Sequence, residues 1–524
     1  MKQYQTSVVI IGAGPAGLTL AHLLASYNID TILLEQQAQT TDEPRAIGID
    51  SETLRTMQAI DLVDDIKEEV FSHLELTDYV NAEGKVLFNF DTRGYEPYGF
   101  PLMNTFEQPV VDRVLANKLS DCEGVELWFN HTLRHFQQDD QGVTVYAENA
   151  QGEQITISAQ YLVGCDGGRS TVRNQLGIEM TGESNEFPWL VIDTIDPGFD
   201  DGFSSRFFCD PQRPGMTINT GKQRRRWEWM LMPGETAADL LDDNVIANLI
   251  GPYTDPSQVT VRRKRVYNFA AIIAERWQEG RVFLAGDAAH MTPPFAGQGL
   301  NSGMRDVRNL SWKLAMVVNG VASPALLETY VEERWNHARE LIQFALDLGE
   351  QIQPIDPQKA AERDTFFFEL RKDPNAVEEF ANGMAASIRA RALDKGVVVG
   401  VGENPLNGQL LYQPKVGLNP ENAVPLDEIL GKGFSIVGHN CDPEQELSSQ
   451  TIAQWKNLGA TLVALGDNSD ANGYRDQSGI LTEQIPNNEK IMVLVRPDKF
   501  CLATFNAQTA DNTLAQAAEL LHLL

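Results

Sequence analysis

Ser7-Val8-Val9-Ile10-Ile11-Gly12-Ala13-Gly14-Pro15-Ala16-Gly17 is the stretch from which the architecture of this chain can first be inferred. The apolar run from Ser7 to Ile11 predicts a parallel strand that is buried on both faces. The residues beyond the glycine turn predict a helix from Ala16 to Tyr27 and a second strand from Thr31 to Leu34. A buried strand, a G-x-G-x-x-G turn and a helix in this order predict a dinucleotide-binding βαβ unit.

Each glycine of this turn meets a different geometric requirement. A pyrophosphate must approach the backbone amides at the start of the helix, and side chains would block that approach. Gly12 permits the tight turn, Gly14 the close approach, and Gly17 the contact between helix and strand. Glu35 stands at the end of the second strand, where its carboxylate would accept hydrogen bonds from an adenosine ribose. This unit alone does not distinguish FAD from NAD, and a glycine turn without a ligand is the alternative.

Two later segments repeat a strand that ends in an acidic residue beside glycine. Tyr161 to Cys165 leads into Asp166-Gly167-Gly168, and Arg281 to Ala285 leads into Gly286-Asp287. The second is followed by Pro293-Pro294 and a glycine loop, Gly297 to Gly303. A carboxylate at a strand end can accept hydrogen bonds from ribityl hydroxyls, and amides at a helix start favour the electron-rich edge of a reduced flavin. Each segment alone could be a turn and a cap, but the three in this order indicate FAD.

These three motifs resemble those of the class A flavoprotein aromatic hydroxylases, the p-hydroxybenzoate hydroxylase family, over residues 7–350. Further segments are similar to the 3-(3-hydroxyphenyl)propionate hydroxylases of that family: Pro44–Asp50, Phe106–Pro109, Met232–Thr236 and Gly297–Asp306. The resemblance implies FAD as cofactor, NADH or NADPH as co-substrate with NADH favoured, and O2. The implied reaction is hydroxylation of a phenolic aromatic acid, such as 3-(3-hydroxyphenyl)propionate or a related phenol, to a catechol-type product. Met291–Ala296 departs from the family's pattern, which leaves the phenol open.

The motifs and the resemblance together assign site residues. Tyr98, Tyr267 and His290 are the candidates for a catalytic base, and the alternative for His290 is a structural residue beside the flavin. Arg206, Arg213 and Arg226 are candidates for holding a substrate carboxylate, unless they are ordinary surface arginines. No metal site is expected. The expected cofactor-binding residues are Gly12, Gly14, Pro15, Ala16, Gly17, Glu35, Gln36, Arg45, Gln108, Asp166, Gly286, Asp287, Pro294, Gly297, Gly299, Leu300 and Asn301.

The chain is expected to be an α/β protein (α+β overall) of three domains. A discontinuous Rossmann-like FAD-binding domain is expected over 1–72, 104–180 and 277–390, and a β-rich substrate domain over 73–103 and 181–276. A connector and a thioredoxin-like domain, the latter implied by the resemblance, are expected over 391–524. Cys441 and Cys501 form no C-x-x-C pair, so a structural or dimerisation role is expected for the last domain. The FAD-binding part is expected to include a helix from Leu54 to Val70 and a meander of Val125–Phe136, Val143–Ala147 and Gln154–Ile157.

Composition restricts the partners. The chain has 73 acidic and 42 basic residues and a formal net charge of -31, so nucleic acid and anionic membrane surfaces are not expected as partners. Arg224-Arg225-Arg226 is the dense basic run that stands out, and its side chains are expected on a strand rim. Five widely spaced cysteines, no signal peptide and no apolar run long enough to span a bilayer favour a cytoplasmic protein. A homodimer is allowed.

Two other function classes are weighed against hydroxylation. Trp227-Glu228-Trp229 matches the W-x-W pattern of flavin-dependent halogenases, although sheet-face tryptophans in a core are the favoured interpretation. A halogenase or another flavin oxidoreductase acting on an aromatic substrate is therefore the first alternative. A non-enzymatic dinucleotide-binding regulator is the second.

Overall fold

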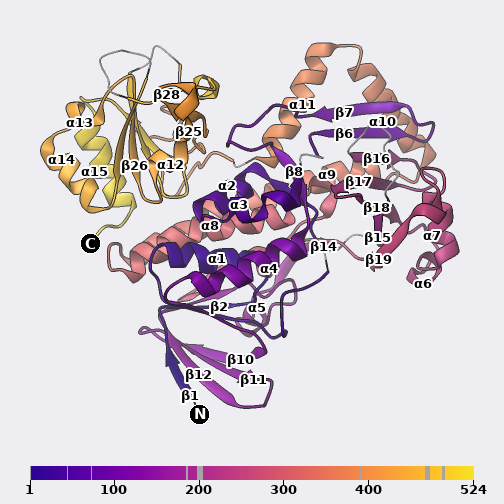
Figure 1. The fold of residues 1–524 in the computed structure, drawn as a ribbon, viewed down its shortest axis with the longest axis horizontal. Coiled ribbons are helices and arrows are strands. Elements are labelled where there is room, and N and C mark those ends of the chain that lie inside the picture. Colours follow the sequence, from indigo (N-terminus) through magenta and orange to yellow (C-terminus); the bar gives the residue numbers. More distant parts are fainter. Residues whose placement is uncertain are drawn as a thin grey trace.

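The computed structural model describes residues 2–43, 45–71, 74–184, 187–196, 205–389, 391–466, 473–486 and 490–524. Figure 1 shows the sheet around β2 and its helices at the centre, a second sheet region at the right, and the C-terminal domain at the upper left. No helix among the described residues is long and apolar enough to cross a membrane.

The central domain is built on a sheet of six strands in the order β21-β22-β13-β2-β3-β9. Five of them are parallel, and β21 is an antiparallel edge strand. Val8, Val9 and Ile10 of β2 are completely buried, as the continuous apolar run predicts. The strands are β2 (Val8–Ile11), β3 (Thr31–Leu34), β9 (Val125–Trp128), β13 (Tyr161–Gly164), β21 (Gln278–Glu279) and β22 (Val282–Leu284).

Helices and a β-meander cover this sheet on opposite sides (Figure 1). Val145 and Ile157 of the meander belong to the same core as β2. The glycine turn lies on the side of the sheet that the helices cover, because α1 starts directly after it. The covering elements are α1 (Pro15–Ser26), α4 (Gln108–Lys118), α8 (Gly299–Val318), β10 (His131–Gln138), β11 (Val143–Asn149) and β12 (Gln154–Ala159).

Two expected elements of this domain differ in the structure. The expected helix from Leu54 to Val70 is broken into α2 (Ser51–Ala59) and α3 (Val63–Ile66), followed by a short 3-10 turn and β5 (Val70–Phe71). Asp61 has a left-handed φ of 61°, which a continuing helix does not allow. The expected first meander strand is also divided, at Asn130 with φ 58°, and its first part is β9 of the parallel sheet.

The second domain is a sheet of seven strands in the order β19-β15-β18-β17-β16-β6-β7. Trp227 and Trp229 on one face pack under α6 (Ala237–Leu240) and α7 (Asp243–Ile250). Phe367 and Met384 share a core with the other face, so α10 (Pro357–Leu370) and α11 (Pro374–Ile388) lie with this domain and not with the FAD-binding domain, which was expected to reach residue 390. The strands are β6 (Leu76–Asn81), β7 (Val86–Asp91), β15 (Trp189–Ile195), β16 (Ser205–Cys209), β17 (Gly215–Gly221), β18 (Arg224–Met230) and β19 (Thr260–Tyr267).

The C-terminal domain has a sheet in the order β27-β26-β29-β30, in which β29 is antiparallel to both neighbours. Two parallel strands joined through a helix, a hairpin and a final helix form the thioredoxin-like arrangement. Trp312 of α8 belongs to its core, so this domain packs directly on a helix of the central domain. The elements are β26 (Ser435–His439), α14 (Ser449–Asn457), β27 (Thr461–Leu465), β29 (Ile491–Val495), β30 (Cys501–Phe505) and α15 (Ala510–Leu520).

Candidate cofactor and active site

The glycine turn has the geometry that its sequence predicts. Gly12 has φ 102°, and a Cβ there would lie 2.5 Å from the carbonyl oxygen of Cys165. A Cβ on Gly17 would lie 2.0 Å from the carbonyl oxygen of Gly12. A Cβ on Gly14 would meet nothing within 4 Å. Gly12 and Gly17 are therefore required by the protein itself, whereas Gly14 leaves open space at the start of α1, before Pro15 and Ala16.

Glu35 fixes the end of β3 against this turn. One carboxylate oxygen accepts a hydrogen bond from the Ala13 amide at 2.9 Å, and the other accepts one from the Gln37 amide at 2.8 Å. Gln36 beside it is exposed. Both oxygens of Glu35 retain further lone pairs, so the residue can hold the turn and accept ribose hydroxyls at once.

Gln108 is hydrogen-bonded to the loop that contains Arg45. Its side-chain oxygen accepts hydrogen bonds from the amides of Arg45 and Ala46 at 3.1 and 2.8 Å. Its side-chain nitrogen donates to Asp112 at 3.2 Å. Asp112 is 1% exposed, and burial raises the pKa of its carboxyl group to about 7. The Arg45 side chain itself is exposed; the preceding Pro44 lies outside the described residues.

The two acidic strand ends have different surroundings. Asp166 accepts hydrogen bonds from the Ser170 hydroxyl and the Thr171 amide, at 2.5 and 2.7 Å, so it organises the start of α5 (Thr171–Gln175). The side chain of Asp287 is exposed, yet the protein around it raises the pKa of its carboxyl group by desolvation. An exposed carboxylate at this strand end is available to accept hydrogen bonds from ribityl hydroxyls.

His290, three residues after Asp287, is buried and belongs to a group of hydrogen-bonded residues around Asp306. Its Nε2 donates to Asp306 at 2.7 Å, and its ring stacks on Trp277 with centroids 5.1 Å apart. Asp306 also accepts from the Gly286 amide at 3.1 Å and from Arg334 at 3.0 Å. His290 is 1% exposed. We infer that His290 is a positioning residue, because this geometry directs it to α8 and not to a substrate.

The loop before α8 is held by Asn301. Gly297 has φ 63° and ends a short 3-10 turn that starts at Pro294. The Asn301 side chain donates to the Gly297 carbonyl at 2.8 Å and accepts from the Asp50 amide at 3.1 Å. The N-terminus of α8, with Gly299 and the half-buried Leu300, is thereby presented at the loop.

The seven-stranded sheet turns one face toward these residues. Arg226 donates to the Arg45 carbonyl at 3.2 Å, and Met230 shares a core with Met103 and Phe295. Phe295 lies between the Gly-Asp motif and Gly297. Rings of Trp189, Phe269 and Phe295 lie 5.5–6.4 Å apart on this face. These three rings form an aromatic wall, in which Phe295 of the loop before α8 packs directly on Trp189 of the sheet.

The two tyrosine candidates for a catalytic base, Tyr98 and Tyr267, lie in different parts of the fold. Tyr267 lies on the sheet beside Arg263 and Arg265, and its hydroxyl has no hydrogen-bond partner among the described residues. Tyr98 is buried at the connector, where it contacts Arg55 and Tyr412; burial raises the pKa of its hydroxyl well above the usual value.

The three arginines proposed for a substrate carboxylate already have acidic partners. Arg206 pairs with Asp78 at 2.9 Å. Arg213 pairs with Glu235, and Arg226 with Asp193, both through two nitrogens. The structure therefore supplies no arginine of this set whose charge is uncompensated.

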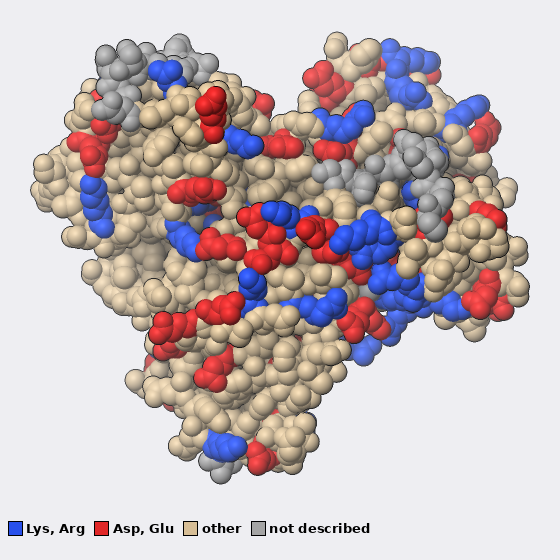
Figure 2. Space-filling view, in the orientation of Figure 1, with Lys and Arg blue, Asp and Glu red and all other residues tan. Residues whose placement is uncertain are grey.

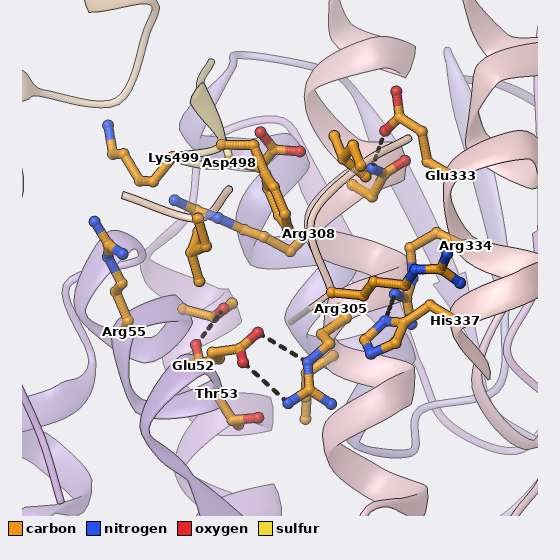
Figure 3. A pocket seen from close by; sticks show the side chains of 17 residues that line it. Glu52, Thr53, Arg55, Arg305, Arg308, Glu333, Arg334, His337, Asp498 and Lys499 are labelled. Carbon is orange, nitrogen blue, oxygen red and sulfur yellow. Dashed lines mark hydrogen bonds and ion pairs between the residues drawn. The ribbon is translucent and has the colours of Figure 1, made fainter. Parts of the chain in front are cut away.

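Two hollows lie apart from the flavin-binding loop. One has a volume of about 40 Å³ and lies among α2, α8, α9 (Glu328–Ile352) and the C-terminal domain; Figure 3 shows Arg305 pointing to Glu52 there. This volume accommodates only a few water molecules. The other, of about 420 Å³, is lined by Arg262, Arg263, Lys264 and Arg265 with Asp42, Glu43 and Asp193. Figure 2 shows Lys and Arg concentrated where the second domain meets the flavin domain.

The residues present fit FAD. The space at Gly14 would accept a pyrophosphate, Glu35 an adenosine ribose, and Asp287 the ribityl chain. Sequence reasoning gave no role to Asp112, Asp306 or Glu228, although Asp306 ends the segment Gly297–Asp306 and Glu228 is the central residue of Trp227-Glu228-Trp229. It also missed the run of four basic residues from Arg262, which is denser than Arg224–Arg226 and was visible in the sequence.

Comparison with known proteins supports the assignment of an FAD-binding protein. Residues 5–345 match the model of the FAD binding domain family, and residues 408–520 match the HcaD C-terminal domain. The chain is 35% identical to a 3-(3-hydroxy-phenyl)propionate/3-hydroxycinnamic acid hydroxylase of Shigella sonnei (strain Ss046), covering 99% of this chain and 95% of that one. It is 34% identical to the protein of the same name from Burkholderia cenocepacia (strain HI2424), covering 96% and 94%.

Solved structures share the fold. The flavin-dependent monooxygenase PieE, in complex with FAD and substrate, has a TM-score of 0.82 at 21% identity over 100% of both chains. The OxyS anhydrotetracycline hydroxylase from Streptomyces rimosus has a TM-score of 0.78 at 25% identity over 99% of both chains.

Proposed function

This chain belongs to the FAD binding domain family and to the group of 3-(3-hydroxy-phenyl)propionate/3-hydroxycinnamic acid hydroxylases within it, and we propose that it hydroxylates a phenolic aromatic acid. The substrate is 3-(3-hydroxyphenyl)propionate or a related phenol, and the product is a catechol. In the balanced reaction, the phenol, O2, NAD(P)H and a proton give the catechol, NAD(P)+ and water. NADH is the favoured co-substrate.

The chain's residues would hold FAD through the elements described above. Gly12, Gly14 and Gly17 present the α1 amides, and Asp287 faces the ribityl position. Bound FAD supplies acceptance of hydride from NAD(P)H and activation of O2, which no side chain provides. The protein orients the phenol and excludes water from the reacting atoms.

The observation that carries the proposal is the apposition of Phe295 and the aromatic face of the second domain. Phe295 lies within the loop that leads to Gly297, and it packs edge-to-face on Trp189 at 5.5 Å. An aromatic ring bound on this face would lie beside the expected flavin edge. Trp227 and Trp229, which favoured a halogenase by pattern alone, pack on the opposite face under α6 and α7.

The test is turnover of the purified, FAD-loaded chain with a panel of 3-hydroxyphenyl acids and simple phenols under 18O2. We expect NADH consumption to be stimulated by the substrate and the product to gain one 18O atom. Hydrogen peroxide in equal amount to NADH, without product, would contradict hydroxylation. Halogenated product in the presence of chloride or bromide would support the alternative chemistry instead.

Cellular location and assembly belong to the same proposal. We propose a cytoplasmic location, supported by five cysteines that are all free and four of which are buried. For the C-terminal domain we propose a structural role, supported by the core that it shares with α8. Light scattering on the full chain decides whether it is also a homodimer.

A further inference from the structure

Glu228 lies on the face of β18 that points toward the flavin domain. Side chains alternate between the two faces of a strand, so residues 224, 226, 228 and 230 share one face. Arg224 pairs with Glu107 at 2.9 Å, and Arg226 donates to the Arg45 carbonyl. Since both contacts reach the flavin domain, Glu228 also points toward it.

The immediate neighbours of Glu228 on that face are largely apolar. Met230 follows it on the strand, and Val191 and Met216 lie directly opposite on the two adjacent strands. Met230 packs in the cluster that contains Phe295. Glu228 therefore stands between the Arg45 loop and the aromatic wall, where a phenol ring would lie.

The carboxyl group of Glu228 is left without a hydrogen bond. The residue is 5% exposed, and no hydrogen bond to its carboxyl group is found among the described residues. Its oxygens are not among the completely buried atoms without a partner, so they keep slight access to solvent. The nearest cation is Arg226, with 3.8 Å between Nη1 and Oε1, and that arginine is already bonded through two nitrogens to Asp193. A largely buried carboxyl without a hydrogen bond costs free energy, and the slight access of its oxygens leaves room for a partner that is not part of the chain.

The electrostatic surroundings adjust the proton affinity of Glu228. Burial raises its pKa to about 7, with Asp193 raising it further and Arg226 opposing the shift. A group with a pKa near neutrality is effective as a general base, because it is ionised yet retains affinity for a proton.

We infer that Glu228 is the catalytic base that takes the proton from the phenol hydroxyl of the substrate. The substrate O–H bond breaks, its electron pair stays on oxygen, and the proton passes to a carboxylate oxygen of Glu228. The resulting phenolate has higher electron density at the ortho and para carbons, where oxygen is transferred. The proton later leaves with the catechol or through solvent. This inference rests on the proposed function.

Other candidates are less suitable. The Tyr98 ring packs against Tyr412 at the connector, away from the aromatic wall. Nε2 of His290 is bonded to Asp306 at 2.7 Å, which directs the ring toward α8, although its Nδ1 has no partner among the described residues. Tyr267 lies on the same sheet and serves as a comparison, because its hydroxyl is also without a partner. A phenol hydroxyl is itself a weak base at neutral pH, so Glu228 is favoured.

The test uses the full-length FAD-loaded chain and its variants Glu228→Gln, Glu228→Asp and Tyr267→Phe. The ionisation of bound 3-(3-hydroxyphenyl)propionate is followed by ultraviolet difference spectra between pH 6 and 9. We expect the wild type to bind the phenolate near pH 7.5 and Glu228→Gln to bind the neutral phenol. We also expect kcat to fall about 100-fold or more in Glu228→Gln, to recover in part in Glu228→Asp, and to fall much less in Tyr267→Phe than in Glu228→Gln.

Controls separate this inference from folding and from the proposed function. FAD content and the thermal midpoint of Glu228→Gln should equal or exceed those of the wild type, because a buried charge is removed. A Glu228→Gln variant that still binds the phenolate and keeps kcat would overturn the inference. If the wild type binds the phenolate but forms no hydroxylated product, the proposed function fails while the assignment of Glu228 as base stands.

Discussion

Gly14 and Gly12 occupy the same turn for different physical reasons. The protein itself needs Gly12, since a Cβ at φ 102° would lie 2.5 Å from a carbonyl oxygen. Nothing in the protein needs Gly14, where a Cβ would be in open space. The requirement at Gly14 therefore comes from the cofactor.

We predict that Gly14→Val preserves folding of the apoprotein but weakens FAD binding at least tenfold, because the side chain fills the pyrophosphate position. Gly12→Ala should lower the free energy of unfolding by about 2–4 kcal/mol. Flavin absorbance after gel filtration and thermal melts of the apoprotein measure the two effects. Full FAD occupancy in Gly14→Val would show that the pyrophosphate lies elsewhere.

Asp112 makes the free energy of unfolding depend on pH. Burial raises the pKa of its carboxyl group from 3.8 to about 7. Because the folded value is the higher one, its favourable contribution is complete below about pH 4 and is lost as the pH rises through about 7. Asp112→Asn has no carboxyl group at this position, so its stability should not fall in this way. Between pH 5 and 8.5, the free energy of unfolding of the variant should therefore increase relative to that of the wild type by on the order of 2–4 kcal/mol. Urea unfolding at several pH values measures it, with exposed Asp121→Asn as the control that should behave as the wild type.

At the scale of elements, α8 organises the flavin domain. Its Asn301 holds the Gly297 loop, and its Gly303 lies against Gly286. Asp306, one turn later, binds His290 and Arg334. One helix thus fixes the glycine loop, the Gly-Asp motif and α9 together.

Strand β19 contributes a basic edge to a strongly acidic chain. Arg262 and Arg265 are 40% and 51% exposed at the side chain and line the cleft of about 420 Å³. We predict that the double variant Arg262→Ala/Arg265→Ala raises the KM for NADH about tenfold and reduces its dependence on salt, because the cofactor's pyrophosphate is attracted to this edge. Stopped-flow reduction of FAD measures it. Arg276→Ala, which removes an arginine of 55% exposure paired with Glu279, is the control and should leave the KM unchanged.

For the whole molecule, a buried ionic network joins two domains. Glu333 of α9 binds Arg496 at 2.8 Å and Lys313 at 2.9 Å, and all three side chains are 0% exposed. Arg496 also binds Asp498, which accepts from Trp312. These cations hold the pKa of Glu333 at about 2, although burial alone would raise it.

Glu333→Gln should therefore lower the free energy of unfolding by about 3–5 kcal/mol, because the buried Lys313 would lose its carboxylate partner and Arg496 would keep only Asp498. Glu444→Gln removes an exposed pair with Lys456 and should cost less than about 1 kcal/mol. Urea unfolding followed by flavin release and by tryptophan fluorescence measures both. A C-terminal domain that unfolds separately in Glu333→Gln, with no earlier loss of FAD, would show that the network does not support the flavin domain.

The sequence by itself determined the βαβ start and the order of the three flavin motifs, whereas the thioredoxin-like end was implied by the family resemblance. These are local features, because a glycine turn, a strand end and a helix start are set by the residues that form them. The apolar run at β2 and the glycines at 12 and 17 meet in the structure the constraints that their types imply.

Only the tertiary structure decided which distant residues meet. It placed β9 in the parallel sheet, packed α10 and α11 on the second sheet, and put Glu228 on the face of β18 that meets the flavin domain. Asp306 acts through His290 and Arg334, which are distant along the chain. Asp112 and Glu228 have near neighbours, Gln108 and Arg226, but nothing in the sequence marks the burial that the fold gives them. Strand order and domain packing bring these side chains out of water together, and burial then changes the proton affinities of Asp112 and Glu228 on which the predictions rest.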